Sequence, residues 1–445
     1  MNQATSVKLA RVLSWIIAGI LVLLPFHAFF TSWAANNFGH LDVFRVWKEI
    51  ILSLLLPLVL LLAWSRDDTK QFLKNSLIVR LFIGYVLLHI ILGAWALSNH
   101  SVTKTALLYS LIINLRFIGF FIITYIVASH SHFLRENAAK ILVIPAAIVV
   151  VVGLLQRLVM PHSFLAYFYG WGTIPPYQTI DGNNKIQRVQ STLRGANPLG
   201  AYLVLALTAF VAPVKQRYLK FAAVAATLIV LFYSYSRSGW IGALISVWLL
   251  AWWMLLKSHH RIWLVVSVVA IALMAGGAFY VLRSKPIAQD TFLHTSSVSK
   301  APMSSNEVRR ASLKSGIHDV VHEPLGRGPG TAGPASFRNQ PHPARIAESY
   351  YLQIGQEVGI LGMAIFITIN ILAAKEIWLK RDKMLARVLL ASLAGITFIN
   401  LISHAWTDDT LSLLWWGLAG IVLAPAIITE KHKRKNGQKI SKAAA

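Results

Sequence analysis

Residues 138–158 read AAKILVIPAAIVVVVGLLQRL, and only Lys140, Gln156 and Arg157 in this stretch are strongly polar. A helix of about 20 apolar residues crosses the hydrocarbon of a bilayer, because only a helix satisfies its own backbone groups there. The fold class predicted is therefore an all-α polytopic membrane protein. Runs of this kind predict twelve spans, near 11–34, 44–64, 76–97, 105–127, 138–158, 196–213, 217–236, 238–257, 262–283, 349–374, 387–406 and 411–430.

The composition agrees with a membrane protein. Of the 445 residues, 56% are apolar and 13% are charged, which leaves too little polar surface for a soluble globule. The formal net charge of +25 would suggest nucleic acid, but the Lys and Arg residues lie mostly in short loops between apolar runs. The chain has no cysteine, which excludes disulfides, thiolate nucleophiles and Cys-ligated metals. The first apolar run is too long for a signal-peptide core, so we expect a retained helix.

The loops alternate in charge. One set is rich in Lys and Arg, whereas 35–43 and 405–410 in the other set contain neither. Under the positive-inside rule, both termini are predicted to be cytoplasmic. Two long loops, 159–195 and 284–348, then fall on the outer side, and the second contains a predicted helix at 307–321.

Three parts of the chain are predicted from this arrangement. They are the N-terminal transmembrane helices at 1–158, a core with the large outer loop at 159–430, and a basic cytoplasmic tail at 431–445.

Charged residues collect on the predicted outer face. Arg194 precedes an Asn-Pro helix start, where free backbone N–H groups also favour an anion. Arg237 lies at a tight connection, and Glu348 lies where the chain re-enters the membrane. Taken singly, such residues are also explained as interface anchors or as a loop carboxylate. Their gathering on one face favours a site that binds an anion.

Other charges have simpler interpretations. Asp408 and Asp409, beside His404, are expected to keep a short outer loop polar. Arg116 lies within the fourth span and is costly there unless it is paired, with Lys48 and Glu49 as candidate partners. The GRGPG segment at 326–330 lacks the Lys-Ser/Thr ending of a phosphate-binding Walker loop, and a Pro-Gly turn explains it.

Four strings, in this order, resemble the O-antigen ligase and O-antigen polymerase superfamily of bacterial membrane glycosyltransferases. They are RGANPLGAYL at 194–203, SRSGWIGAL at 236–244, EVRRASLKSGIHDVVHEPLGRGPG at 307–330 and SYYLQIGQEVGILG at 349–362. Many members of that superfamily have His-Asn immediately before the last string, where this chain has Glu348-Ser349. The likeness is strongest over 185–365, and the first five spans match only loosely.

The resemblance implies an enzyme of the bacterial cytoplasmic membrane with no cofactor and no metal. Its donor would be a glycan on a polyprenyl diphosphate, held by the bilayer-embedded helices, and its acceptor a sugar hydroxyl at the outer face. Arg194 and Arg237 would neutralise the departing diphosphate, and Glu348 would be the base of an inverting displacement. Substrate-binding candidates are Lys48, Asn197, Arg309, Arg310, Arg327, Tyr351 and Gln353.

Three other functions are compatible with the sequence. A transporter or flippase of lipid-linked glycans would need charges along a path through the bilayer, and Arg116 is one such charge. A protein O-oligosaccharyltransferase would use the same donor with a protein acceptor. A purely structural membrane partner would leave the outer arginines without a role.

Overall fold

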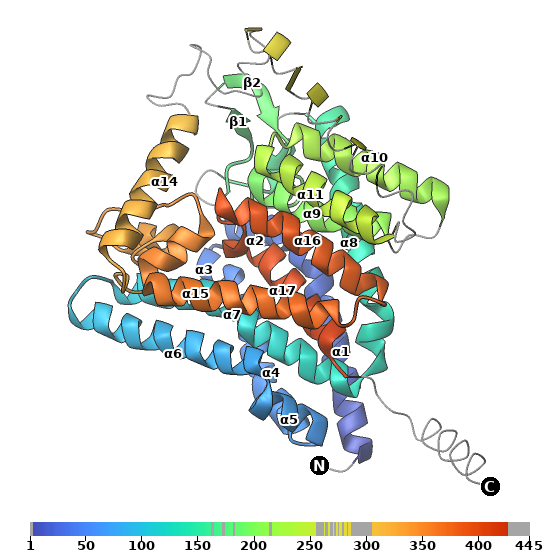
Figure 1. Cartoon of the computed structure of the whole chain (residues 1–445), viewed down its shortest axis with the longest axis vertical. Coiled ribbons are helices and arrows are strands. Elements are labelled where there is room, and N and C mark those ends of the chain that lie inside the picture. The colour runs from blue at the N-terminus through green and yellow to red at the C-terminus, as the bar shows by residue number, and fades with distance from the viewer. Residues whose placement is uncertain are drawn as a thin grey trace.

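The computed structural model describes residues 3–254 and 305–425, apart from 162–163, 171–173, 181–182 and 213–215, together with scattered residues between 262 and 285. Nearly all described elements are helical (Figure 1). The longer helices are α1 (Gln3–Leu23), α2 (His27–Phe38), α4 (Trp47–Ala63), α6 (Leu77–Ser98), α7 (Lys104–His130), α8 (His132–Leu158), α9 (Ala196–Val211), α10 (Arg217–Tyr233), α11 (Arg237–Met254), α14 (Ser305–His322), α15 (Tyr350–Trp378), α16 (Met384–Leu401) and α17 (Asp409–Leu423). Shorter elements are η1 (Leu24–Phe26), α3 (Leu41–Arg45), α5 (Asp67–Asn75), η2 (Phe164–Tyr167), β1 (Gln178–Ile180), β2 (Asn183–Arg188), η4 (Gly333–Arg338) and η5 (Ala405–Thr407).

The protein is a multi-pass membrane protein, but the predicted count of twelve spans is not confirmed. Among the described residues, six helices are long and apolar enough to cross a membrane, or seven if the bent pair α4–α5 is one span. Helices occupy the other predicted positions except 262–283, which lies largely outside the described residues, as does the predicted tail 431–445. The helix predicted at 307–321 is confirmed as α14.

Two short apolar helices form the centre of the bundle. Helix α17 has 15 residues and is buried from Thr410 to Leu423, packed against α7, α16, α15 and α9. Helix α9 has 16 residues, and Leu199 to Phe210 are all buried. A helix that is apolar on every side is stable only when other helices surround it, which explains this central position. At 1.5 Å per residue, α17 is about 22 Å long, shorter than the roughly 30 Å of hydrocarbon.

The loops between the helices meet in two separate groups. In the first, Asn36 Nδ2 donates to the Phe168 carbonyl (3.1 Å) and Thr103 N donates to Asn339 Oδ1 (2.8 Å). In the second, Ser65 contacts His130 (Oγ to Nε2, 3.0 Å). These groups match the Lys/Arg-poor and Lys/Arg-rich sets of loops. Which group faces the cytoplasm stays a prediction.

The segment 159–195 differs from the expected all-α fold. It contains a small antiparallel hairpin in which β1 pairs with β2, with Gln178 opposite Arg188. The hairpin supports the beginning of α9, because the Gln178 side chain accepts a hydrogen bond from Ala196 N (2.9 Å). This polar strand pair has no hydropathy signal, so the sequence did not reveal it.

A buried carboxylate fixes the Gly-rich turn that precedes Glu348. Glu357 on α15 is fully buried and accepts hydrogen bonds from Ser110 Oγ (2.9 Å), Asn114 Nδ2 (2.6 Å) and Gly330 N (2.7 Å). The prediction that GRGPG is a structural turn agrees with this contact, because its Gly330 N–H already has a carboxylate partner within the protein.

Candidate functional site

A polar cavity of about 380 Å³ lies where α9, α15 and the α16–α17 connection meet. We call it the Glu348 cavity. It brings together two of the three residues predicted to act in catalysis, Arg194 and Glu348. The other lining residues include Gln178, Asn197, Pro334, Ser403, His404 and Asp408.

The loop before α9 holds Arg194 rigidly. Gln156 Oε1 accepts hydrogen bonds from Ser191 N (2.8 Å) and Gln190 N (3.2 Å), and Thr192 Oγ1 donates to the Pro25 carbonyl (2.8 Å). Ser191 has φ of 51°, a conformation that non-glycine residues rarely adopt. A side chain from α8 and a backbone carbonyl from η1 thus fix the loop that carries Arg194.

Arg194 forms an ion pair with Asp408 across the cavity wall. Arg194 Nε lies 2.9 Å from Asp408 Oδ2, and Asp408 also accepts from Leu411 N (3.2 Å) as the N-cap of α17. The Asp408 side chain is 4% exposed, whereas that of Arg194 is 37% exposed, so the guanidinium group can still reach a ligand. Burial raises the pKa of the Asp408 carboxyl, and the Arg194 charge opposes this rise. The expectation that Asp408 only keeps a loop polar is therefore wrong.

Glu348 occupies a strained position at the cavity. Its φ is 51°, and the following residues attach it to the α16–α17 connection, since Tyr350 N donates to the Ser403 carbonyl (3.0 Å) and Ser349 Oγ to the Asn400 carbonyl (3.2 Å). Glu348 Oε2 lies 3.7 Å from Arg309 Nη2. Non-glycine residues at positive φ cost free energy and often occur at functional sites. The carboxylate is 25% exposed and hence accessible to an acceptor.

Arg237 is connected to this region through α14. Its Nη2 donates to Asn306 Oδ1 (2.6 Å), one turn before Arg309, which pairs with Glu348. Arg237 does not line the Glu348 cavity. The beginning of α14 therefore contacts both Arg237, through Asn306, and Glu348, through Arg309.

In the sequence, His404 stands beside Asp408 and Asp409 at a predicted span end, but no role was predicted for it. It lines the Glu348 cavity between α16 and α17. Burial lowers the pKa of His404, although the nearby Glu348 carboxylate raises it. The imidazole is therefore neutral at neutral pH and is a second proton acceptor beside Glu348. Its position before two acidic residues at a span end was the available sequence signal.

The remaining substrate-binding candidates lie in different surroundings. Asn197 lines the cavity and accepts from Arg188 Nη2 (2.6 Å). Arg310 is exposed beside Arg309 on α14. Arg327 pairs with Glu323 at the other end of α14, away from the cavity. Tyr351 and Gln353 are buried in the first turn of α15.

Lys48 belongs to a buried ion cluster with Arg116, Glu49, His27 and Asp409. Its Nζ lies 2.8 Å from Asp409 and 3.3 Å from Glu49, and Arg116 Nη1 lies 3.5 Å from Glu49. The predicted pairing of Arg116 with Glu49 is thus present. Asp409 also contacts His27 Nε2 (2.9 Å), so the interpretation of Asp409 as a merely polar loop residue is wrong. His27 lies inside an apolar run, and only the folded chain brings it to Asp409.

Within the described part of the chain, no group of three or more His, Asp or Glu side chains is arranged to hold a metal ion.

These observations define a multi-pass membrane protein with a charged cavity at one end of its helices. A family model described as O-antigen ligase matches residues 222–367, which include Arg237, Arg309 and Glu348. The match confirms the predicted resemblance to the O-antigen ligase superfamily, and it supports a glycan-transferring membrane enzyme. A search of curated proteins found no match.

Proposed function

We propose that the protein transfers a glycan from a polyprenyl diphosphate carrier to a sugar hydroxyl of an acceptor, at the outer face of the bacterial cytoplasmic membrane. The observation that carries this proposal is the cavity shared by Arg194 and Glu348, a fixed cation and an accessible carboxylate. The family match, which covers Glu348 but not Arg194, supports glycan transfer in general.

The reaction is a single displacement at the anomeric carbon. The Glu348 carboxylate takes the proton of the acceptor hydroxyl, whose oxygen forms the new bond to the anomeric carbon. The bond from that carbon to the diphosphate oxygen breaks, and its electron pair leaves with the diphosphate. The Arg194 guanidinium offsets the developing negative charge, as metal ions do in other transferases. One displacement inverts the anomeric configuration.

Arg237 has a supporting role in this scheme. Through Asn306 it holds the beginning of α14, and Arg309, one turn later, pairs with Glu348. A direct contact between Arg237 and the diphosphate, as the resemblance implies, remains a prediction.

The decisive experiment uses purified protein in nanodiscs with a polyprenyl-diphosphate glycan and a sugar acceptor. Glu348→Gln should lower the transfer rate by about 10²–10⁴-fold, the usual contribution of a general base. Glu323→Gln is the control, because Glu323 pairs with Arg327 and Arg345 outside the cavity, and it should transfer at the normal rate. Full activity of Glu348→Gln together with inactive His404→Gln would assign the base to His404 instead.

A flippase is the second candidate, and Arg116 was the charge that favoured it. Arg116 now pairs with Glu49, and its Nη2 donates to the Thr407 carbonyl (2.7 Å), so it is bound at the loop end of the bundle. Movement of lipid-linked glycan across protein-containing vesicles without new glycosidic bonds would support the flippase over the transferase.

A further inference from the structure

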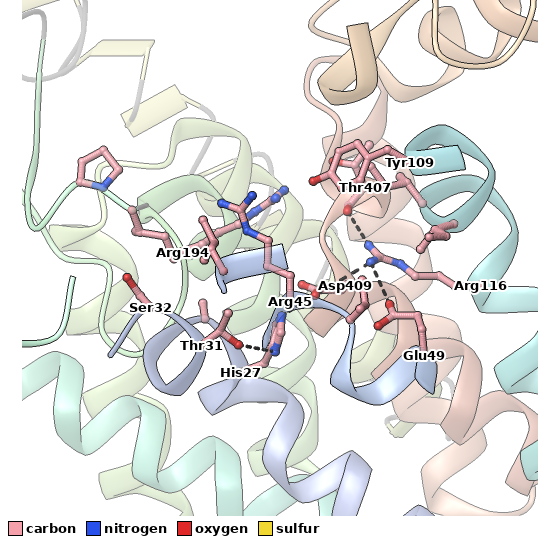
Figure 2. Close-up of a pocket in the computed structure, with 17 residues that line it drawn as sticks. His27, Thr31, Ser32, Arg45, Glu49, Tyr109, Arg116, Arg194, Thr407 and Asp409 are labelled. Atoms are coloured by element: carbon pink, nitrogen blue, oxygen red, sulfur yellow. Dashed lines mark hydrogen bonds and ion pairs between the residues drawn. The ribbon is translucent and has the colours of Figure 1, made fainter. Parts of the chain in front are cut away.

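A second cavity, of about 230 Å³, also has Arg194 among its lining residues. We call it the Arg116 cavity. Arg45, Arg116 and Arg194 all line it, together with His27 and Tyr109 (Figure 2). Arg194 lines both cavities, whereas Glu348 lines only the first. Arg194 is thus a lining residue common to two polar spaces.

Arginines outnumber carboxylates in the lining of the Arg116 cavity, and two of them, Arg194 and Arg45, also pair with Asp408 and Asp42 outside that lining. Its three arginines face two carboxylates, Glu49 and Asp409. Glu49 and Asp409 also pair with Lys48, at 3.3 Å and 2.8 Å respectively, so they do not neutralise the arginines completely. The pairs from Arg116 to Glu49 and Asp409 are long, at 3.5 Å and 3.9 Å. An anion entering the cavity would therefore gain favourable contacts.

Arg116 also has an unused donor. Its side chain is only 9% exposed, and among the described residues its buried Nε has no hydrogen-bond partner. A buried donor without a partner costs about 1–3 kcal/mol. In Figure 2 the Arg116 side chain extends toward Asp409 and Glu49 at the cavity wall.

The geometry of the displacement indicates which anion the Arg116 cavity would bind. In a single inverting step, the attacking oxygen and the leaving oxygen lie on opposite sides of the anomeric carbon. An acceptor deprotonated by Glu348 must approach from the Glu348 cavity. The leaving group must then depart away from the Glu348 cavity, and the Arg116 cavity is the polar space that shares Arg194 with it.

We propose that the Arg116 cavity binds the diphosphate of the polyprenyl donor, with Arg45 and Arg116 as binding residues in addition to Arg194. This inference rests on the proposed function. The anomeric carbon lies beside Arg194, the acceptor oxygen forms its bond from the Glu348 side, and the broken bond releases the diphosphate among the three arginines. The N-terminal helices, through Arg45 and Arg116, therefore supply part of the donor site.

Binding of farnesyl diphosphate to the full chain in phosphatidylcholine nanodiscs tests this, because it needs no transfer. Arg45→Gln should weaken binding about 10-fold, as expected for one lost charge-assisted contact of roughly 1.4 kcal/mol, and Arg45→Lys should recover part of it. Arg45 is 34% exposed on a five-residue helix, so its replacement should not impair folding. Arg80→Gln is the control, since Arg80 is exposed, donates to the Asn75 carbonyl (2.9 Å) and does not line the cavity. It should bind within about twofold of the unsubstituted protein.

Two outcomes would overturn the assignment. One is unchanged binding of farnesyl diphosphate by Arg45→Gln. The other is equal competition by phosphatidylglycerol or farnesyl monophosphate, which would indicate a general anionic headgroup site. Glu348→Gln should bind farnesyl diphosphate normally while losing transfer. If Glu348→Gln loses transfer but Arg45→Gln binds farnesyl diphosphate normally, this inference fails and the proposed function stands. If Glu348→Gln keeps its transfer activity, Glu348 is not the base, whatever the binding result.

Discussion

At the scale of single residues, the Arg194–Asp408 pair offers a clear test of how a cation is held at the cavity. Asp408→Asn should reduce the transfer rate about 10-fold, because a hydrogen bond to a charged group contributes roughly 1.5–3 kcal/mol. The thermal midpoint should change little, since Asn also caps the N-terminus of α17 and Arg194 is 37% exposed to solvent. Rates and midpoints are measured on the same preparation.

Asp67→Asn serves as the comparison, because the Asp67 side chain is 97% exposed at the other end of the bundle. A normal transfer rate in Asp408→Asn would show that this ion pair does not position Arg194.

His404 predicts a pH dependence of stability. Its pKa in the folded protein is lowered by burial from an ordinary value of about 6.5. Below about pH 6.5 the unfolded chain binds the proton first, so this group destabilises the fold progressively as the pH falls toward the lowered pKa. His404→Gln should therefore lose less thermal stability than the unsubstituted protein between about pH 7.5 and 5.5. Parallel curves for the two proteins would contradict a lowered pKa.

The sequence predicted functional residues where a charged side chain stood at a position that is usually uncharged. Arg194 and Glu348 stood out because charges are unusual at the outer ends of spans, and both do line one cavity. Asp409 and His27 could not be assigned in this way. Their roles depend on a contact between segments near opposite ends of the chain, which a local pattern does not contain.

At the scale of elements, the break in α15 determines where the Gly-rich turn lies. Val358 and Gly359 have non-helical backbone angles, and Gly359 has φ of +72°. A Cβ at Gly359 would clash with the Pro324 carbonyl oxygen. Gly359→Ala should destabilise the fold by about 1–3 kcal/mol, because this backbone region is nearly restricted to glycine. The thermal midpoint in detergent measures the effect.

A matched glycine is available for comparison in α6. At Gly84 no atom lies within 4 Å of the position that an added methyl group would take, so Gly84→Ala should leave the midpoint unchanged or raise it slightly. Equal midpoints for the two variants would contradict the proposed constraint at Gly359.

Hydropathy predicted where helices occur better than how many cross the bilayer. A run of apolar residues is stable either in lipid or inside a shell of other helices. Helices α9 and α17 are of the second kind, buried on all sides and only 16 and 15 residues long. Sequence alone cannot distinguish the two environments, because both remove the same apolar surface from water.

At the scale of the whole molecule, the sidedness of the two loop groups can be tested directly. The chain has no cysteine, so single cysteines can be introduced without a background. Asn37→Cys should react with an impermeant maleimide from outside the cytoplasmic membrane, because its loop belongs to the Lys/Arg-poor group. Asp67→Cys should react only after the membrane is opened. The reverse pattern would invert the predicted topology and place both cavities at the cytoplasm.

The central position of α17 has a consequence for assembly. In the chain, this helix follows every helix that it packs against, including α7, α16 and α9. During synthesis those earlier helices enter the membrane before the helix that fills the space between them. Asp408 and Asp409 are placed together with α17, so until this helix packs Arg194 lacks Asp408, and Lys48 lacks Asp409 but has Glu49. The packing of α17 therefore fills the centre of the bundle and, in the same step, brings the carboxylates that pair with these two cations.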